Sequence, residues 1–195
     1  MPQWHLHQHG TFHVTTNTKD KEPWCIVPGI PQIIIGNLLL TRHLQQAKVH
    51  AFCILPDHMH IIFEPGKRGL SAFVKSFKEN SSRQIRRYRN GDLNASLVSA
   101  DAVVCADMSG LPTPASTFHG WQHGFHAQRI VQPGHYEQTI QYVERNASHH
   151  GLVRTAKEWP WTSLHFGHLM DSGACPLRAV RNIFSSLSQK VVTIR

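Results

Sequence analysis

Residues 56–63 read Pro-Asp-His-Met-His-Ile-Ile-Phe and place two histidines inside an apolar, β-prone stretch. Because side chains of a strand alternate between its two faces, His58, His60 and Ile62 share one face, and the residues between them point into a core. Two imidazoles side by side on a rigid strand form half of a divalent-metal site. His-x-His pairs are also common, and this chain has 16 histidines, so the pair alone does not establish a site.

Length and charge favour one basic domain with a polyanionic partner. A chain of 195 residues can bury a substantial core, and we expect a single domain over residues 1–195. The net charge of +8 and the pI of about 9.7 favour nucleic acid or an acidic membrane surface as the partner. The four cysteines form no C-x-x-C pair, so we expect reduced thiols in the cytoplasm. No stretch is long and apolar enough to predict a membrane span.

Hydrophobic patterns predict an α+β domain. We expect strands at residues 11–16, 49–55, 58–63 and 128–132, and helices at residues 30–47, 71–88 and 135–146. This order suits an antiparallel sheet with helices packed on one face. Residues 92–117 are rich in Ala and Ser and lack Lys and Arg, so we interpret them as an inserted loop. Residues 165–195 form a weakly patterned C-terminal tail.

The predicted helix at residues 71–88 combines an apolar face with dense positive charge. We expect its basic side chains to contact phosphate groups, although a solvated helix face would carry similar charges. Trp121 and Phe125 are candidates for stacking on bases, with burial in the core as the alternative, whereas the Trp159-Pro-Trp161 turn indicates structural packing. The basic candidates are Lys67, Arg68, Lys75, Lys78, Arg83, Arg86 and Arg87.

Tyr142 and Asn146 lie four residues apart on the last predicted helix, so we expect them to share a face. An Asn carbonyl oxygen is a suitable hard ligand for Mg²⁺ or Mn²⁺ beside two imidazoles. A phenolate is a good nucleophile toward a phosphodiester, and a metal ion polarises the scissile phosphate. From the spacing alone, a core tyrosine and a helix-capping asparagine are the simpler interpretation.

Four motifs in a fixed order carry a family resemblance. With them the chain, from about residue 11 to residue 163, resembles the REP-associated tyrosine transposases, which belong to the single-tyrosine HUH (His-hydrophobic-His) transposases of insertion sequences. The motifs are PDHMHIIFEP at residues 56–65, WQHGFH at residues 121–126, YVERN at residues 142–146, and GLV at residues 151–153 followed by EWPWTS at residues 158–163.

The resemblance implies a ferredoxin-like sheet with the HUH pair on a central strand. It implies that His58, His60 and Asn146 bind a divalent metal, Mg²⁺ or Mn²⁺, and that Tyr142 is the nucleophile. The implied substrate is single-stranded DNA with a hairpin beside the cleavage site, cut through a 5′-phosphotyrosine intermediate and rejoined without ATP. The implied setting is the bacterial cytoplasm, with a monomer favoured over a homodimer.

Three departures from the family pattern affect local geometry. Ala127 stands where relatives often carry an acidic residue, and Ala147 replaces the proline that commonly follows the asparagine. The inserted loop at residues 92–117 is longer than the usual connection. None of these removes a group assigned to the reaction.

Two other functions remain open from the sequence. A histidine-triad nucleotide hydrolase also has alternating histidines on a strand, but it needs a third histidine where this chain has Ile62. The second alternative is a catalytically silent hairpin-binding protein derived from a transposase. Such a protein would bind DNA or RNA, because hairpins and single strands of both are recognised in similar ways.

Overall fold

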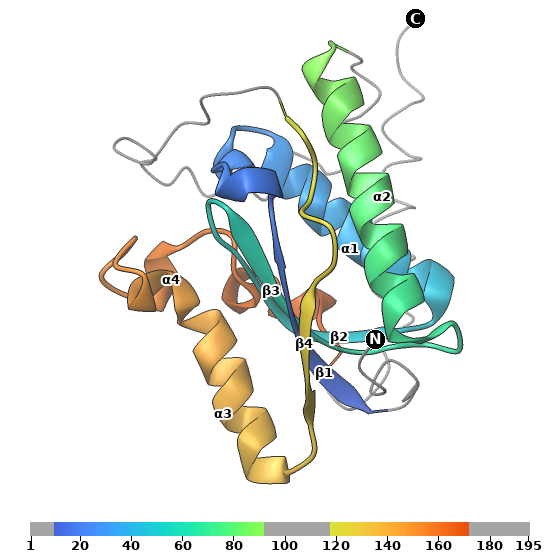
Figure 1. The fold of residues 1–195 in the computed structure, drawn as a ribbon. Coiled ribbons are helices and arrows are strands. Elements are labelled where there is room, and N and C mark those ends of the chain that lie inside the picture. The colour runs from blue at the N-terminus through green and yellow to red at the C-terminus, as the bar shows by residue number, and fades with distance from the viewer. Residues whose placement is uncertain (1–9, 92–117, 172–195) are drawn as a thin grey trace, which may run out of the picture.

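The computed structural model describes residues 10–91 and 118–171, which form a four-stranded antiparallel sheet with helices on both of its faces (Figure 1). The strand order is β2-β3-β1-β4, so β3, which carries the two histidines, is a central strand as expected. The predicted inserted loop, residues 92–117, and most of the predicted tail lie outside the described residues. The strands are β1 (Thr11–Asn17), β2 (Lys48–Ile54), β3 (His58–Glu64) and β4 (His126–Ile130).

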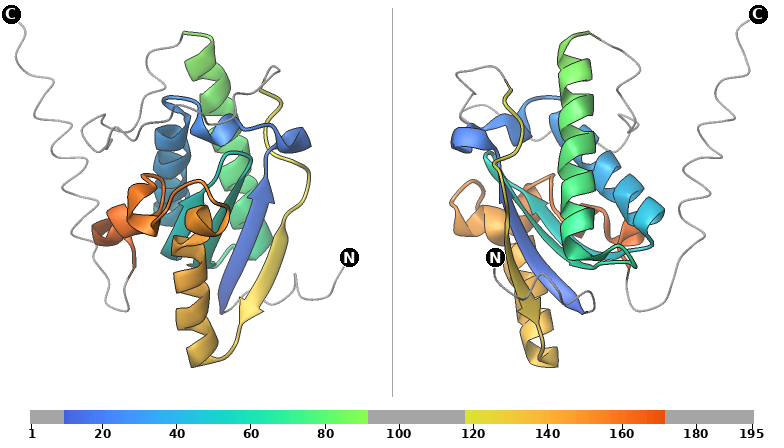
Figure 2. Two further views of the ribbon diagram at one scale, coloured as in Figure 1. Left: turned by 90° about the vertical axis from the view of Figure 1, so that its left-hand side faces the viewer. Right: turned by 45° about the vertical axis from the view of Figure 1, so that its right-hand side comes forward.

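The helices are α1 (Ile30–Gln45), α2 (Gly69–Arg89), α3 (Pro133–Glu144) and the short α4 (Asn146–His149). α1 and α2 pack together on one face of the sheet, and α3 lies on the other face, where it contacts β2 and β3 (Figures 1 and 2). The α+β class and the antiparallel sheet are confirmed. The helices cover both faces of the sheet, however, and not the single face that we expected. β3 carries apolar side chains on both faces, with Met59 and Ile61 facing one way and Ile62 the other, and all three are buried.

The core between the sheet and α2 follows from the alternation of β1 and β3. Phe12 and Val14 of β1 are buried and pair with Phe63 and Ile61 of β3. Phe63 stacks on Phe73 of α2, with ring centroids 4.2 Å apart. This apolar face turns the opposite face of β1 and β3, which carries the histidines, toward α3. Among residues 10–91 and 118–171, no helix has the length and apolar character needed to cross a membrane.

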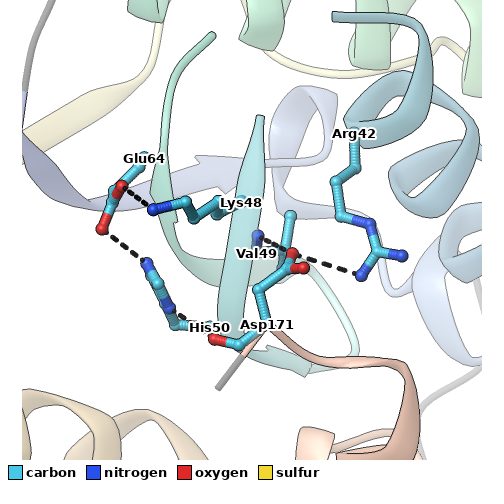
Figure 3. Close-up of polar contacts among 6 residues, drawn as sticks. All are labelled: Arg42, Lys48, Val49, His50, Glu64 and Asp171. Carbon is cyan, nitrogen blue, oxygen red and sulfur yellow. Dashed lines mark hydrogen bonds and ion pairs between the residues drawn. The ribbon is translucent and has the colours of Figure 1, made fainter. Parts of the chain in front are cut away.

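β2 forms one edge of the sheet, and Asp171 covers its beginning (Figure 3). The Asp171 amide donates to the carbonyl of Val49 at 2.9 Å, and the Val49 amide donates to the Asp171 carboxylate at 2.8 Å. The same carboxylate pairs with buried Arg42 at 3.3 Å. His50 lies between the Asp171 carbonyl, at 2.9 Å, and the Glu64 carboxylate, at 3.2 Å. The first residues of the predicted tail therefore complete the sheet.

The aromatic turn near residue 160 covers the other end of β2. The Ile54 amide donates to the Trp161 carbonyl, and the Trp159 indole donates to the Ile54 carbonyl, both at 2.8 Å. Both tryptophans are buried. The expectation that this turn serves structural packing is confirmed.

Candidate metal and nucleophile site

The pairing of β1 with β3 assembles one polar face of the sheet. In this register, Thr15 of β1 lies opposite His60, Asn17 lies opposite His58, and His13 lies opposite Ile62. Because the side chains of β1 alternate strictly, His13, Thr15 and Asn17 face the side covered by α3, whereas Phe12, Val14 and Thr16 are buried on the other side. Side chains from two strands therefore meet below the helix that carries Tyr142.

The imidazole of His60 is buried and held through one ring nitrogen. Its Nδ1 lies 3.0 Å from Nε2 of His13 and 3.0 Å from the hydroxyl of Thr15. Burial, and to a smaller extent the nearby imidazoles of His13, His58 and His150, lower the pKa of His60 to about 3. His60 is therefore neutral at pH 7, which is the form that binds a metal ion, and its Nε2 is the nitrogen available for this.

His58 is oriented by the residue before it. Its Nδ1 lies 2.6 Å from the Asp57 carboxylate, and this hydrogen bond is the main cause that lowers the pKa of Asp57. A carboxylate on the second ring nitrogen is the usual support of a metal-binding histidine. The ring centroids of His58 and His60 lie 5.1 Å apart, so the two imidazoles are neighbours.

Asn146 is fully buried beside this pair. Neither its amide oxygen nor its amide nitrogen has a hydrogen-bond partner among the described residues. Its side chain is close enough to His60 to act on the imidazole, raising the pKa of His60 against the larger effect of burial. A buried amide without a partner costs free energy, so the site lacks a group that would satisfy the oxygen.

Tyr142 lies next to the histidines but not on the same helix as Asn146. α3 ends at Glu144, and Asn146 begins α4 after Arg145, whose backbone is not α-helical. The expectation of one continuous helix is therefore wrong, although both side chains lie close to His60: Tyr142 is 45% exposed, whereas Asn146 is fully buried. The break is consistent with the low preference of asparagine for helix interiors.

The ring contacts of Tyr142 place it over the polar face. Its ring centroid lies 5.9 Å from that of His60 and 6.0 Å from that of His13. His149 of α4 stacks against it at 5.9 Å. The tyrosine is thus held near the histidine pair while its side chain remains accessible to a substrate.

The donor set fits a divalent ion with two nitrogen ligands and one oxygen ligand. Among residues 10–91 and 118–171, no group of three or more His, Cys, Asp or Glu side chains is arranged to bind a metal. A metal at His58 and His60 would therefore need a ligand of another type, and the unpaired amide oxygen of Asn146 supplies one. Two imidazoles with an amide oxygen suit Mn²⁺ or Mg²⁺.

An open pocket of about 380 Å³ lies beside Tyr142, which forms part of its wall. It is lined by side chains from β1, β4 and α3. Of these residues, sequence analysis identified only Tyr142, and it also missed Thr15, because the proximity of the others depends on strand pairing and helix placement that no local pattern encodes. The lining residues are His13, Gln128, His135, Gln138, Thr139 and Tyr142.

The basic residues predicted to bind DNA occupy different environments. Lys67 and Arg68 are exposed in the turn after β3, at the end of that strand away from His58. Lys75 is exposed and pairs with Glu79 at 3.9 Å. Lys78 is partly buried, and its ammonium donates to the carbonyls of Gln122 and Gly124.

The rest of the basic face lies toward the end of α2. Arg83 and Arg87 are exposed, and the guanidinium of Arg86 lies 6.0 Å from the ring of Phe118. Trp121 packs against Phe77 of α2, with centroids 5.7 Å apart.

The two aromatic candidates for base stacking are both partly buried. The indole of Trp121 also donates to the hydroxyl of Ser81 at 2.9 Å. Phe125 packs against the core from the segment before β4. Their roles in base stacking stay predictions.

Comparisons with known proteins agree with this architecture. Residues 10–97 match the family of IS200-like transposases. The fold is similar to the structure of a REP-associated tyrosine transposase bound to a REP hairpin, with a TM-score of 0.58, 18% identity, and coverage of 86% of this chain and 87% of that chain.

A weaker likeness, with a TM-score of 0.44 and 16% identity, links 70% of this chain to 89% of a candidate transposase from Deinococcus radiodurans R1. No curated protein matches the chain. The family match and the shared fold together confirm the resemblance to the tyrosine transposases that the sequence motifs indicate.

Proposed function

We propose that this protein is a metal-dependent endonuclease and strand transferase that acts on single-stranded DNA beside a hairpin. One observation carries the proposal: Tyr142 lies against His60 on the same side of the sheet as the buried, unpaired amide of Asn146. A nucleophile, two imidazoles and an unsatisfied oxygen within one site support phosphoryl transfer.

In this proposal, His58, His60 and Asn146 hold the divalent ion. When bound, the ion polarises the scissile phosphate and stabilises the departing 3′ oxygen. Asp57, His13 and Thr15 fix the orientation of the two imidazoles. These contacts occupy Nδ1 of each imidazole, so Nε2 of each is the nitrogen that would bind the ion.

Tyr142 performs the covalent step. Its phenolic oxygen attacks the phosphorus, an oxygen–phosphorus bond to the tyrosine forms, and the bond to the 3′ oxygen breaks. The 3′ oxygen leaves as a hydroxyl with the proton that the phenol gives up, and the 5′-phosphate stays on Tyr142. Attack by a 3′ hydroxyl on this linkage reverses the step and joins the strand without ATP.

Substrate binding is proposed to use the positive charge of α2 and of the turn before it. Lys75, Arg83 and Arg87 are exposed on this helix, and Lys67 and Arg68 are exposed in the turn. A single-stranded backbone tracks such a surface through phosphate contacts. Lys78, Arg86, Trp121 and Phe125 complete the proposed contact set, the last two through base stacking.

The test is a covalent-adduct assay. The protein is incubated with Mg²⁺ or Mn²⁺ and labelled hairpin-bearing oligonucleotides from the DNA that flanks its gene, and the products are separated on a denaturing protein gel. We expect a metal-dependent shifted band that is absent from Tyr142→Phe. Tight hairpin binding without an adduct would instead favour the silent binding protein, and RNA hairpins as competitors would separate DNA from RNA recognition.

A further inference from the structure

We propose that the pocket between β4 and α3 binds the base of one nucleotide that flanks the scissile phosphate. This inference rests on the proposed function and deepens it, because it assigns a source of sequence preference at the cleavage site. The pocket volume of about 380 Å³ is in the range of small-ligand sites. Tyr142 forms one wall, so whatever occupies the pocket lies beside the nucleophile.

The chemistry of the lining favours a base over a phosphate. None of the six lining residues is Lys, Arg, Asp or Glu. The lining instead offers the two amides of Gln128 and Gln138, the hydroxyl of Thr139 and two imidazoles. Amides present a donor and an acceptor together, which is the pattern that pairs with a base edge.

The amides also come from two separate elements that face each other across the pocket. Gln128 lies on β4, opposite His13 of β1 in the sheet register, and Gln138 lies one turn before Tyr142 on α3. Both side chains are exposed, so they are free to reach a ligand, and the aromatic rings of His135 and Tyr142 offer surfaces for stacking. A flat, hydrogen-bonding ligand fits this arrangement.

The experiment uses the full chain and an oligonucleotide pool with one fixed hairpin and random nucleotides on both sides of the cleaved bond. Sequencing of the adducts measures base preference at each flanking position. We expect wild-type protein to prefer one base at one position by about tenfold. Gln128→Ala and Gln138→Ala should flatten this preference, while Gln141→Ala, an exposed amide of the same helix outside the pocket, should preserve it.

A binding arm separates failure of this inference from failure of the proposed function. Tyr142→Phe is titrated with the selected oligonucleotide and with a copy that carries an abasic site at the preferred position. The inference predicts a several-fold weaker affinity for the abasic copy, and no such difference once Gln128→Ala is added. Adducts whose base preference survives both glutamine changes would overturn the pocket assignment and leave strand transfer intact.

If the wild-type protein forms no adduct, strand transfer fails, and selecting the same pool for binding to Tyr142→Phe supplies the oligonucleotide and the preferred position for the binding arm, which then decides the pocket. Loss of affinity at the abasic site that depends on Gln128 supports the pocket in a binding protein. Equal affinity for both oligonucleotides overturns it. Thermal unfolding of each variant verifies that the exposed substitutions leave the fold intact.

Discussion

The imidazole of His13 lies 3.0 Å from that of His60, nitrogen to nitrogen, across the pairing of β1 with β3. This contact occupies Nδ1 of His60 and leaves Nε2 for the proposed ion. The same His13 ring lies 6.0 Å from the ring of Tyr142. One side chain therefore contacts both halves of the proposed reaction site without being a ligand or a nucleophile.

His13→Gln should lower the affinity of the site for its metal ion, because His60 loses a group that fixes its tautomer and orientation. Loss of such a supporting contact typically lowers metal affinity or activity about 10–100-fold. We expect the Mn²⁺ concentration for half-maximal adduct formation to rise by a factor in this range, and part of the activity to return at saturating Mn²⁺. His168→Gln, an exposed histidine remote in sequence from the site, is the control. An unchanged metal midpoint would contradict the supporting role.

Asn146→Leu should raise stability and abolish adduct formation. Without metal, the two buried amide atoms have no partner among the described residues, and removing such a group recovers about 1–3 kcal/mol of desolvation cost. The leucine has nearly the same shape, so we expect a gain of about 1 kcal/mol in the free energy of unfolding. Urea unfolding in EDTA measures the gain. A destabilised variant that keeps its activity would remove Asn146 from the ligand set.

Lys78 and Lys75 make a matched pair on α2. Lys78→Gln should lower the free energy of unfolding by about 1–3 kcal/mol, because its ammonium holds two carbonyls of the segment before β4. Lys75→Gln should change it by less than about 0.5 kcal/mol, because Lys75 is exposed. In hairpin binding, Lys75→Gln should reduce the salt slope by about 0.7. Equal stability of the two variants would contradict the structural role of Lys78.

Asp171→Ala should destabilise the fold by about 3 kcal/mol, because it leaves the buried guanidinium of Arg42 without its carboxylate. The Val49 amide also loses its acceptor. Arg42→Met in the Asp171→Ala background should recover part of the loss, and a double-mutant cycle from urea unfolding measures this coupling. Glu137→Ala, an exposed site on α3, is the control. Additive effects of the two changes would show that the pair is not coupled.

Glu158 gives a pH-dependent contribution to stability. Hydrogen bonds from the backbone amides of Thr155 and Arg154 lower its pKa, with Thr155 the larger cause. A lowered pKa in the folded state means that the stabilisation is present above pH 4.5 and is lost as pH falls through the folded pKa. The stability advantage of wild type over Glu158→Gln should therefore shrink between pH 6 and the folded pKa. A constant difference across this range would contradict the assignment.

The sequence predicted most of the elements because their patterns are local. Alternation at residues 58–63 and the amphipathic run before Tyr88 specify a strand and a helix without reference to the rest of the chain. The strand and the helix appear within two residues of their expected ends. The nearness of Tyr142 to His60 followed from the family motifs, since no spacing rule links residues so far apart.

Other parts of the site depend on pairings that a single sequence does not reveal. His13 and Thr15 reach His60 only through the register of β1 on β3. Asp171 lies in a segment without a clear hydrophobic pattern, yet its backbone and carboxylate form hydrogen bonds with the edge strand β2. The end of α3 before Asn146 also escaped prediction, because helix boundaries respond to tertiary contacts that propensity does not include.

The apolar residues that alternate with the histidines on β3 fix the register of this strand, and so fix the position of the histidines on its other face. A slip of β3 by a single residue would turn His58 and His60 toward the apolar core under α1 and α2, and would turn Met59 and Ile61, which are completely or almost completely buried there, toward the polar side chains of β1 and α3. The free energy that holds those two side chains inside therefore also sets where the imidazoles stand. Core substitutions that loosen this register would misalign the proposed ligands before they unfold the protein, and would be detected first as altered metal dependence.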